Sequence, residues 1–597
     1  MEKIVNDLNL KIAGVAGDGI LNAGLMMFAK TVKRAGLYAF ASAEYPSLVR
    51  GGHNHLNVRV SDKPIISQVY ELNLLIALNK ESIENHAALL SENGAIIYDA
   101  DQIKDADTLT QKEKLYPVPL LEFANQAGGR IMKNTVAMGA VFGLVNLDFS
   151  LLENSIKTTF AKKSELIVSG NIAAAKLGYD YAKKNYSKFS FALKPTGVDE
   201  NIFVSGHESV ALGAVKAGCK LICAYPMTPA TSVMTTLEKF AIDANLVVKQ
   251  AEDEIAAMNM VIGGNYAGVR TMTTTSGGGF ALMVEAFGMG MQMETPAVVV
   301  ESMRPGPGTG MATRTGQGDL KFLLNNSTDE SPRIVVAPGC ATDAFELTTH
   351  AFNLAEIWQM PVLIVTDKYV GESYSTVKPF DDSKYKIDRG KLVTEVKEDY
   401  KRYEITKDGV SPRVIPGVKN GMHTATSYEH DEFSFESEDE DNKIMLTQKR
   451  KRKFLNLAKT LPAPELVGDK NAEFVILSWG STKGPILQAM ELLEKEKIKT
   501  SFLQIKYISP FPTEEVLKLT KEKKIILIEN NETGQLGGIL RELSGKEVDY
   551  KILKYDGRAF FPSEIQTGIK NIIKNEKEKV QVFSKNKNVA VENFGVK

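Results

Sequence analysis

Three short motifs in the middle of the chain carry side chains that could bind and transform a small anionic substrate. AYPMTPAT at 224–231 contains prolines that fix an extended turn, from which the Thr228 hydroxyl can project. QAEDEIAAM at 250–258 packs three acids directly before an apolar helical stretch, and ESMRPGPGTG at 301–310 brings a single arginine, Arg304, to a run of turn residues. A carboxyl group suits proton transfer, and an arginine suits pairing with a carboxylate.

A fourth motif, TMTTTSGGG at 271–279, ends a strand in hydroxyls and glycines. Each motif also has a purely structural explanation. Prolines make turns, the helix dipole favours acids at a helix start, and an arginine after a strand often makes a surface ion pair. Because all four motifs lie at strand ends of one predicted unit, their joint occurrence favours a shared site.

The elements that must position these motifs alternate between strands and helices. Ser205 and Glu208 form a capping box that predicts a helix start, and Gly218 predicts the end of that helix. Strand-like KLICAYP, VRTMTTT, AVVVESM and VLIVTD alternate with helical stretches up to about residue 375. This alternation predicts an α/β fold with a doubly wound parallel sheet, in which ligands bind beyond the carboxyl ends of the strands.

Two further α/β units flank this one. The first opens with an apolar strand at 10–15, a glycine-rich turn and an apolar helix at 21–35. The last contains EFVILSWGS, TSFLQIKYISP and KIILIEN as strands, with helices between them. The predicted divisions are 1–185 for the first unit, 186–200 for a linker, 201–375 for the second unit, 376–465 for a connector, 466–575 for the third unit and 576–597 for a surface tail.

The connector contains the acidic run EHDEFSFESEDED at 429–441 and the basic run KRKRK at 449–453. Opposite charges meet there, so we expect a solvated inter-domain segment. The acidic run beside the basic residues argues against a nucleic-acid patch.

The glycine-rich turn GVAGDGI at 14–20 lies where a backbone can approach phosphate at a helix start. Its spacing is Gly-x-x-Gly-x-Gly, so it fails the dinucleotide fingerprint, and Glu44 matches the expected downstream acid only loosely. Gly-Asp-Gly at 17–19 also begins a diphosphate–Mg²⁺ motif of thiamine enzymes, but SAEYPSL at 42–48 lacks the asparagine of that motif. We therefore expect no metal site in this chain. RGGHNH at 50–55 stays open between a solvent-facing turn, a loop for an anionic ligand and a subunit contact.

The composition of the chain excludes several classes of protein. The 597 residues suggest roughly four domains at about 150 residues each. Lys+Arg 72 against Asp+Glu 73 gives a net charge of −1, which supplies no basic field for nucleic acid. The three cysteines, Cys219, Cys223 and Cys340, are too few for a disulfide framework, a Cys₄ zinc site or an iron–sulfur cluster within one chain. The N-terminus lacks a signal-peptide pattern and the most apolar window is interrupted by charges, so we expect a cytoplasmic protein without a membrane span.

With these motifs in place, the chain resembles the alpha subunit of the 2-oxoacid:ferredoxin oxidoreductases, in the form with a gamma domain fused at the N-terminus. Residues 10–60 resemble the gamma domain through their glycines and Arg50-Gly51-Gly52. Residues 205–320 resemble the thiamine pyrimidine-binding domain through YPMTP, the acidic triplet and Arg304 with its Gly-Pro-Gly-Thr-Gly tail. SWGS at 478–481 and the later strands resemble the transketolase C-terminal domain.

The resemblance implies roles for individual residues. Glu254 would bond the far nitrogen of the aminopyrimidine ring of thiamine diphosphate, with Glu252 as the fallback. Arg304 would clamp the substrate carboxylate, and Thr228 would donate to the substrate carboxylate or carbonyl. Further cofactor contacts are expected from Tyr225, Pro226, Thr274 and Thr275, and a coenzyme A contact from Arg50.

The family reaction is the coenzyme A-dependent oxidative decarboxylation of a 2-oxoacid, with electrons passed to ferredoxin. Since this chain lacks a diphosphate motif and a ferredoxin-type cysteine run, the resemblance implies a separate beta subunit that supplies Mg²⁺ and a [4Fe-4S] cluster and shares the cofactor. A dimer of alpha–beta units is expected. The fused layout favours 2-oxoglutarate as substrate. The alternatives are the same reaction on pyruvate or other 2-oxoacids, or a non-catalytic scaffold subunit.

Overall fold

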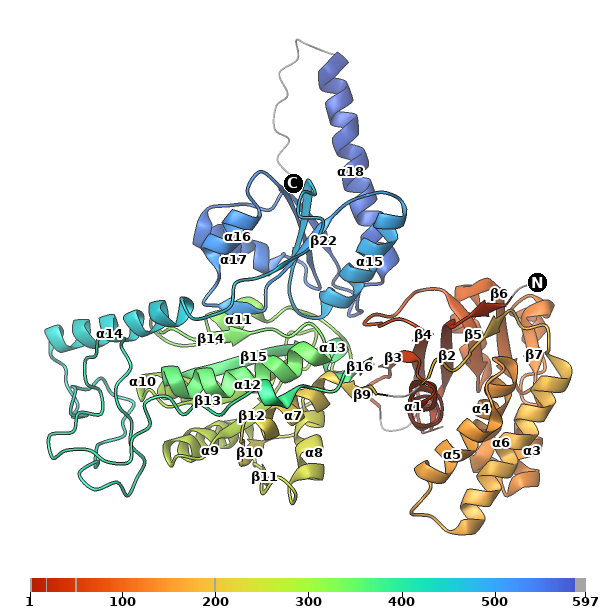
Figure 1. Ribbon diagram of the computed structural model, residues 1–597, viewed down its shortest axis with the longest axis horizontal. Helices are drawn as coiled ribbons and strands as arrows, with labels where there is room; N and C mark the ends of the chain where they lie inside the picture. The colour runs from red at the N-terminus through yellow and green to blue at the C-terminus, as the bar shows by residue number, and fades with distance from the viewer. Residues whose placement is uncertain (1–2, 18, 49–50, 198–199, 586–597) are drawn as a thin grey trace.

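A computed structural model of the chain describes residues 3–17, 19–48, 51–197 and 200–585. Figure 1 shows three α/β bodies: the N-terminal one at one side, the middle one beside it and the C-terminal one above them. In the described residues the main sheets of these bodies have eight, seven and five strands. The α/β multidomain architecture expected from the sequence is confirmed.

The first sheet combines strands from distant parts of the chain. β3 pairs antiparallel with β16, which itself pairs antiparallel with β9, so two strands from beyond residue 200 complete its edge. The sheet therefore crosses the division expected at residue 201, because the entry and exit strands of the second unit pair with the first. Across the sheet the order is β7 (Leu115–Pro117), β6 (Leu90–Tyr98), β5 (Leu72–Ala77), β2 (Asp7–Val15), β4 (His53–Ser61), β3 (Tyr38–Glu44), β16 (Tyr374–Val377) and β9 (Ile202–Ser205), and β1 (Ile4–Val5) pairs separately with β8 (Phe191–Ala192).

Helices cover this sheet through one apolar cluster. Phe28, Phe142 and Ile156 come from three different helices and are fully buried against strand residues such as Leu10 and Val58. The helix expected at 21–35 is present, but its first part has the wider π-helical geometry. The helices are η1 (Asn22–Ala29), α1 (Lys30–Arg34), α2 (Lys80–His86), α3 (Leu120–Ala127), α4 (Lys133–Leu144), α5 (Phe149–Thr159) and α6 (Glu165–Asn185).

The second sheet is the parallel sheet that the alternating pattern predicts, apart from one antiparallel edge strand. Helices cover both faces: α7, α8 and α12 share one apolar cluster, whereas α9 and α10 share another. The predicted capping box is present, since the Ser205 side chain accepts from the Glu208 backbone and the Glu208 side chain accepts from the Ser205 backbone. The strand order is β11 (Val247–Gln250), β10 (Leu221–Ala224), β12 (Thr271–Thr275), β13 (Ala297–Met303), β15 (Pro361–Asp367), β14 (Ile334–Val336) and β20 (Tyr507–Ser509). The helices are α7 (Gly206–Lys216), α8 (Thr231–Phe240), α9 (Glu254–Tyr266), α10 (Gly277–Gln292), α11 (Leu320–Leu324), α12 (Ala341–Trp358) and α13 (Lys368–Glu372).

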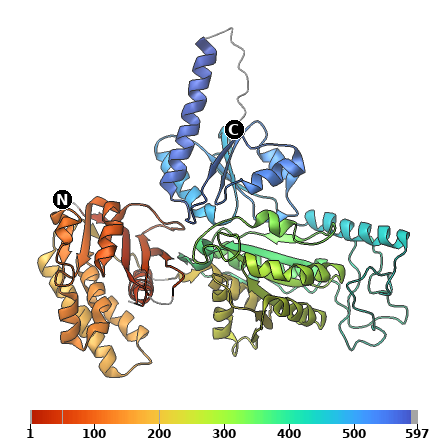
Figure 2. The ribbon, with the colours of Figure 1, turned by 180° about the vertical axis from the view of Figure 1, so that it is seen from behind.

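The third body contains the strands and helices expected after residue 472, with one difference. The stretch expected as one strand at 500–510 is divided, because β19 stays in the third sheet while β20 pairs with β14 of the second. This exchange joins the last two bodies. Figure 2 shows the three bodies from behind, with the C-terminal body above the other two. The elements are β17 (Leu466–Gly468), β18 (Phe474–Ser478), α15 (Lys483–Lys495), β19 (Ser501–Gln504), α16 (Thr513–Leu519), β21 (Lys524–Glu529), α17 (Gln535–Ser544), β22 (Tyr550–Leu553) and α18 (Pro562–Lys585).

The expectation of a solvated basic run is wrong for Lys449, Arg450 and Lys453, which are buried, whereas Lys451 is exposed. The run lies within helix α14 (Glu440–Ala458), where Lys449 and Lys453 are 0% and 2% exposed. Both ammonium groups pair with the fully buried Glu294, at 2.5 and 2.8 Å. Sequence spacing could not reveal this, because the compensating carboxylate lies about 155 residues away, beside β13. The expected tail begins inside α18, which continues to Lys585, and residues 586–597 lie outside the described part.

Candidate functional site

The site predicted from the sequence lies where loops leave the carboxyl ends of β10, β12 and β13. Thr228 follows β10, and Arg304 is the first residue after β13. The Arg304 side chain is buried, and its Nη1 donates to the Thr228 carbonyl oxygen at 2.6 Å. Arg304 Nε has no hydrogen-bond partner among the described residues, so this N–H group of the guanidinium remains available to a ligand.

Glu254 is the first residue of α9 and is 4% exposed, whereas Glu252 is exposed. Asp253 caps the helix by accepting from the Ala256 backbone at 2.7 Å, which turns the Glu254 side chain inward. Glu254 Oε1 is buried without a hydrogen-bond partner in the described chain. A buried carboxylate oxygen without a donor is costly, so this atom is a candidate for bonding an absent ligand. The geometry favours Glu254 over Glu252.

Gly279, in the first turn of α10, holds the Glu254 carboxylate and β12 close together. A Cβ at Gly279 would lie 2.6 Å from Glu254 Oε1 and would also clash with the Thr275 hydroxyl. Only a glycine therefore allows this approach. The requirement explains part of the glycine run that follows TMTTT.

Thr274 and Thr275 are buried at the end of β12. Thr274 Oγ1 donates to the Ala230 carbonyl at 3.3 Å, and Thr275 Oγ1 donates to the Ser276 carbonyl at 3.4 Å. The Thr274 contact ties the β12 end to the loop that carries Thr228. Tyr225 and Pro226 lie on the outer part of that same loop, where Tyr225 is 39% exposed.

A cluster of buried acids beside Arg304 was missed by the sequence analysis. Glu301 in β13 is fully buried, and burial raises its pKa well above the usual range, with Asp319 and Asp367 raising it further and Arg304 opposing them. Burial also raises the pKa of Asp319, opposed by hydrogen bonding with Glu301 and by Arg304. Burial raises the pKa of Asp367, which caps α13, to about 6.

Burial and the neighbouring acids therefore favour the protonated form of Glu301. Neither Glu301 oxygen has a hydrogen-bond partner of normal geometry among the described residues, and the Asp319 carboxyl is the neighbouring acid that acts on it most strongly. Two carboxyl groups hydrogen-bond only when one is protonated. An acid at the end of the apolar strand AVVVESM was the available sequence signal, because a buried strand rarely carries one without a partner.

The structure does not test the two glycine-bearing turns of the first body as ligand sites. Arg50 and Asp18 lie outside the described residues. Gly17, Gly19, Gly51 and Gly52 all adopt positive φ angles, as tight turns require.

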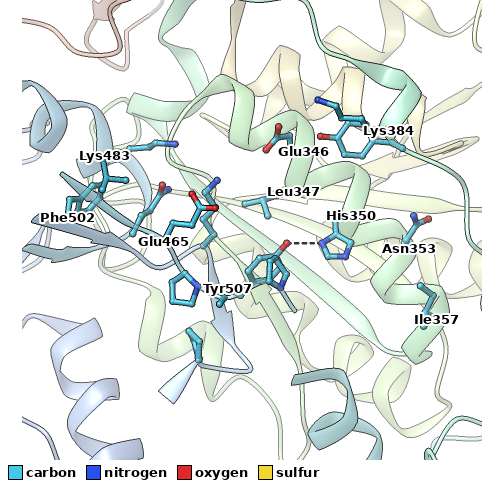
Figure 3. A pocket seen from close by; sticks show the side chains of 18 of the residues that line it. Glu346, Leu347, His350, Asn353, Ile357, Lys384, Glu465, Lys483, Phe502 and Tyr507 are labelled. Carbon is cyan, nitrogen blue, oxygen red and sulfur yellow. Dashed lines mark hydrogen bonds between the residues drawn. The ribbon is translucent and has the colours of Figure 1, made fainter. Parts of the chain in front are cut away.

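A separate cavity of about 680 Å³ lies between α12, the chain before β17 and the third sheet (Figure 3). His350 Nδ1 and the Tyr507 hydroxyl hydrogen-bond at 2.8 Å on its wall. Glu254, Thr228 and Arg304 do not line it. In the described part of the chain no helix is both long and apolar enough to cross a membrane.

Comparison with family models matches most of the chain. Residues 9–181 match the model described as pyruvate ferredoxin/flavodoxin oxidoreductase. Residues 212–449 match pyruvate flavodoxin/ferredoxin oxidoreductase, thiamine diphosphate-binding. Residues 472–565 match pyruvate:ferredoxin oxidoreductase core domain II. The thiamine-related model covers every motif from YPMTP to Arg304.

Similar proteins extend over almost the full length. The 2-oxoacid:ferredoxin oxidoreductase subunit alpha of Saccharolobus solfataricus is 33% identical over 95% of this chain and 98% of its own. The 2-oxoglutarate oxidoreductase subunit KorA of Mycobacterium tuberculosis is 25% identical over 93% of this chain and 90% of its own. The structure of the 2-oxoglutarate:ferredoxin oxidoreductase from Magnetococcus marinus, with 2-oxoglutarate, coenzyme A and succinyl-CoA bound, superposes with a TM-score of 0.90 at 31% identity, covering 95% of this chain and 99% of that one.

Proposed function

The chain belongs to the 2-oxoacid:ferredoxin oxidoreductase family as an alpha subunit, and we propose that it binds 2-oxoglutarate and the pyrimidine half of thiamine diphosphate. The single observation that carries the proposal is the buried, unpartnered Glu254 Oε1 at the edge of the parallel sheet, in the same group of loops as Arg304. The remaining residues are assigned by what they contact.

Glu254 fits a cofactor with a ring nitrogen. Its Oε1 lacks a partner within the described chain, so a hydrogen bond to a protonated ring nitrogen would satisfy it. Thiamine diphosphate, when bound, supplies the electron sink for decarboxylation. Glu254 would hold a proton between Oε1 and that ring nitrogen, and burial among α9, β12 and α10 would keep water from competing for it.

Arg304 and Thr228 fit the substrate. The guanidinium is anchored by its bond to the Thr228 carbonyl, which leaves Nε to pair with the carboxylate next to the keto group. The Thr228 hydroxyl is half-buried in the same loop and would donate to the keto or carboxylate oxygen. Burial raises the pKa of Glu301 beside Arg304, which favours its uncharged form and so limits repulsion of the substrate carboxylate.

Two similarities support 2-oxoglutarate as the substrate. The Mycobacterium tuberculosis relative is named for 2-oxoglutarate, and the Magnetococcus marinus structure contains 2-oxoglutarate with coenzyme A and succinyl-CoA. The product would then be succinyl-CoA. Coenzyme A would approach through the first body, where Arg50 remains the proposed anion contact.

We propose that a beta subunit completes the site with Mg²⁺, the diphosphate pocket and a [4Fe-4S] cluster, and passes electrons to ferredoxin. The three cysteines of this chain support the division, because Cys219 and Cys223 are buried in the second body and Cys340 caps α12. Assembly as a dimer of alpha–beta units and a cytoplasmic location remain predictions.

A substrate panel on the assembled complex tests the proposal. The chain is co-expressed with its partner subunit, and coenzyme A-dependent dye reduction is measured with 2-oxoglutarate, pyruvate, 2-oxobutyrate and a branched-chain 2-oxoacid. We expect the highest kcat/KM with 2-oxoglutarate. A higher kcat/KM with pyruvate would reject the substrate assignment and retain the family.

A further inference from the structure

Three of the seven histidines of the chain meet in the first body. His53 and His55 stand two residues apart on β4, so their side chains share one face of the sheet, and His86 ends helix α2. One ring nitrogen from each lies within 4.8 Å of the other two. The ring centroids are 4.8 to 5.9 Å apart.

Rigid elements hold these rings in place. His53 pairs with Val15 and His55 with Ala13 in the antiparallel β2–β4 ladder. Helix α2 begins at a cap in which Asn79 accepts from the Ser82 backbone at 3.0 Å. Sites built on strands and capped helices are better defined than sites on loops.

The hydrogen bonds of the cluster leave ring nitrogens available. Lys11 Nζ lies 3.3 Å from His86 Nδ1, so the other nitrogen of His86, Nε2, faces the cluster. That Nε2 lies 2.8 Å from His53 Nε2. Within the described residues His53 Nδ1 is buried without a partner, and His55 makes no hydrogen bond through its ring. An ion bound at His86 Nε2 requires the ring proton on Nδ1, so the Lys11 ammonium must turn away from Nδ1 when the ion binds.

We propose that His53, His55 and His86 bind a divalent transition-metal ion of the zinc type, with water as the fourth ligand. Zinc–nitrogen bonds of about 2.0–2.1 Å place tetrahedral ligand nitrogens about 3.4 Å apart. The present separations bracket that value, so small side-chain rotations suffice.

The ligand set also selects the kind of ion. Imidazole nitrogens suit zinc, copper, nickel and cobalt, whereas magnesium and calcium prefer oxygen ligands. Lys11 contacts His86 at Nδ1, the ring nitrogen that would not bind the ion, and its charge also acts on His53 and His55. The ion would fasten the end of α2 to the start of β4, beside the glycine-rich turn that follows β2.

Cobalt titration of the full chain tests the site. The chain is stripped of metal with a chelator, desalted and titrated with Co²⁺ while the visible absorption of bound Co²⁺ is recorded. We expect about one equivalent bound in tetrahedral geometry, displaced by Zn²⁺ because zinc binds such sites more tightly. Zn²⁺ should also raise the Tm, since it binds the folded state.

Histidine variants test whether these three side chains bind the ion. His55→Gln and His53→Ala should each weaken Co²⁺ affinity at least about 100-fold, since even outer-shell changes cost 10–100-fold. His423→Ala is the control, because His423 bonds the Gly421 carbonyl and belongs to a different body of the fold. Circular dichroism checks that each variant is folded.

Three results would overturn the proposal. The wild-type chain could bind no Co²⁺ or Zn²⁺, or the folded His55→Gln variant could bind as tightly as the wild type. Inorganic phosphate could raise the Tm where Zn²⁺ does not, which would make the cluster an anion site.

Discussion

Replacing Arg304 with methionine tests the substrate clamp most closely. Methionine keeps the length and apolar contacts of the side chain but removes every donor. In the wild type, Nη1 donates to the Thr228 carbonyl at 2.6 Å, and the buried Nε has no partner among the described residues. We assign that free donor to the substrate carboxylate.

The size of the effect follows from burial. Removing one partner of a buried, hydrogen-bonded charge pair costs about 2–5 kcal/mol. At 1.36 kcal/mol per tenfold change, kcat/KM should fall by about 30- to 5,000-fold. The substrate carboxylate loses its charge as carbon dioxide forms, so Arg304 stabilises the bound substrate at least as well as the transition state. The loss should therefore appear mainly in KM.

The assay compares two substrates in the assembled complex. 2-Oxoglutarate has a second carboxylate, and 2-oxobutyrate has only the one next to the keto group. Both should lose kcat/KM by the same factor in Arg304→Met. Arg541→Met is the control and should retain full activity, because the Arg541 side chain forms an exposed ion pair with Glu547 in the described part of the chain.

Two outcomes would refute the reasoning. An unchanged KM for both substrates would remove Arg304 from the site. A loss confined to 2-oxoglutarate would show that Arg304 binds the distal carboxylate instead.

Three further predictions concern buried acids. Glu254→Gln should lower kcat by about 10²–10⁴-fold while the Tm stays near the wild-type value, and substantial turnover would remove its proton role. The folded-state pKa of Glu301 is raised, so its contribution to stability is present at low pH and is lost as pH rises toward that pKa. Glu301→Gln should therefore resist alkaline denaturation better than the wild type. An identical dependence of stability on pH in the two proteins would contradict the raised pKa. Glu294→Gln should destabilise the fold by about 3–5 kcal/mol in denaturant titration, because it leaves Lys449 and Lys453 buried without a counter-charge, and a change below about 1 kcal/mol would contradict the pairing.

Local signals predicted much of the second body. The capping box at Ser205 and the strands that end at Ala224, at Thr275 and just before Arg304 all lie close to their expected places. These features depend on residues a few positions apart, which a sequence displays directly. The approach of Arg304 to the Thr228 loop is consistent with the expected shared site, because β10 and β13, with β12 between them, are parallel strands that end at one edge of the sheet.

Features that depend on distant partners could not be predicted. Lys449 and Lys453 resemble a solvated run until Glu294 is placed beside them. His53 and His55 resemble part of a turn until β4 is known to be a strand and α2 brings His86 alongside. In each case a residue's chemistry is set by a partner that only the tertiary fold supplies.

The central claim is that this chain supplies the pyrimidine-side acid and the substrate clamp while a partner supplies the rest of the active site. The most direct measurement is coenzyme A-dependent reduction of a redox dye by 2-oxoglutarate, with the chain purified alone and then co-expressed with its beta subunit. We expect turnover only from the assembled complex. Appreciable turnover by the chain alone would contradict the division of the site between two subunits.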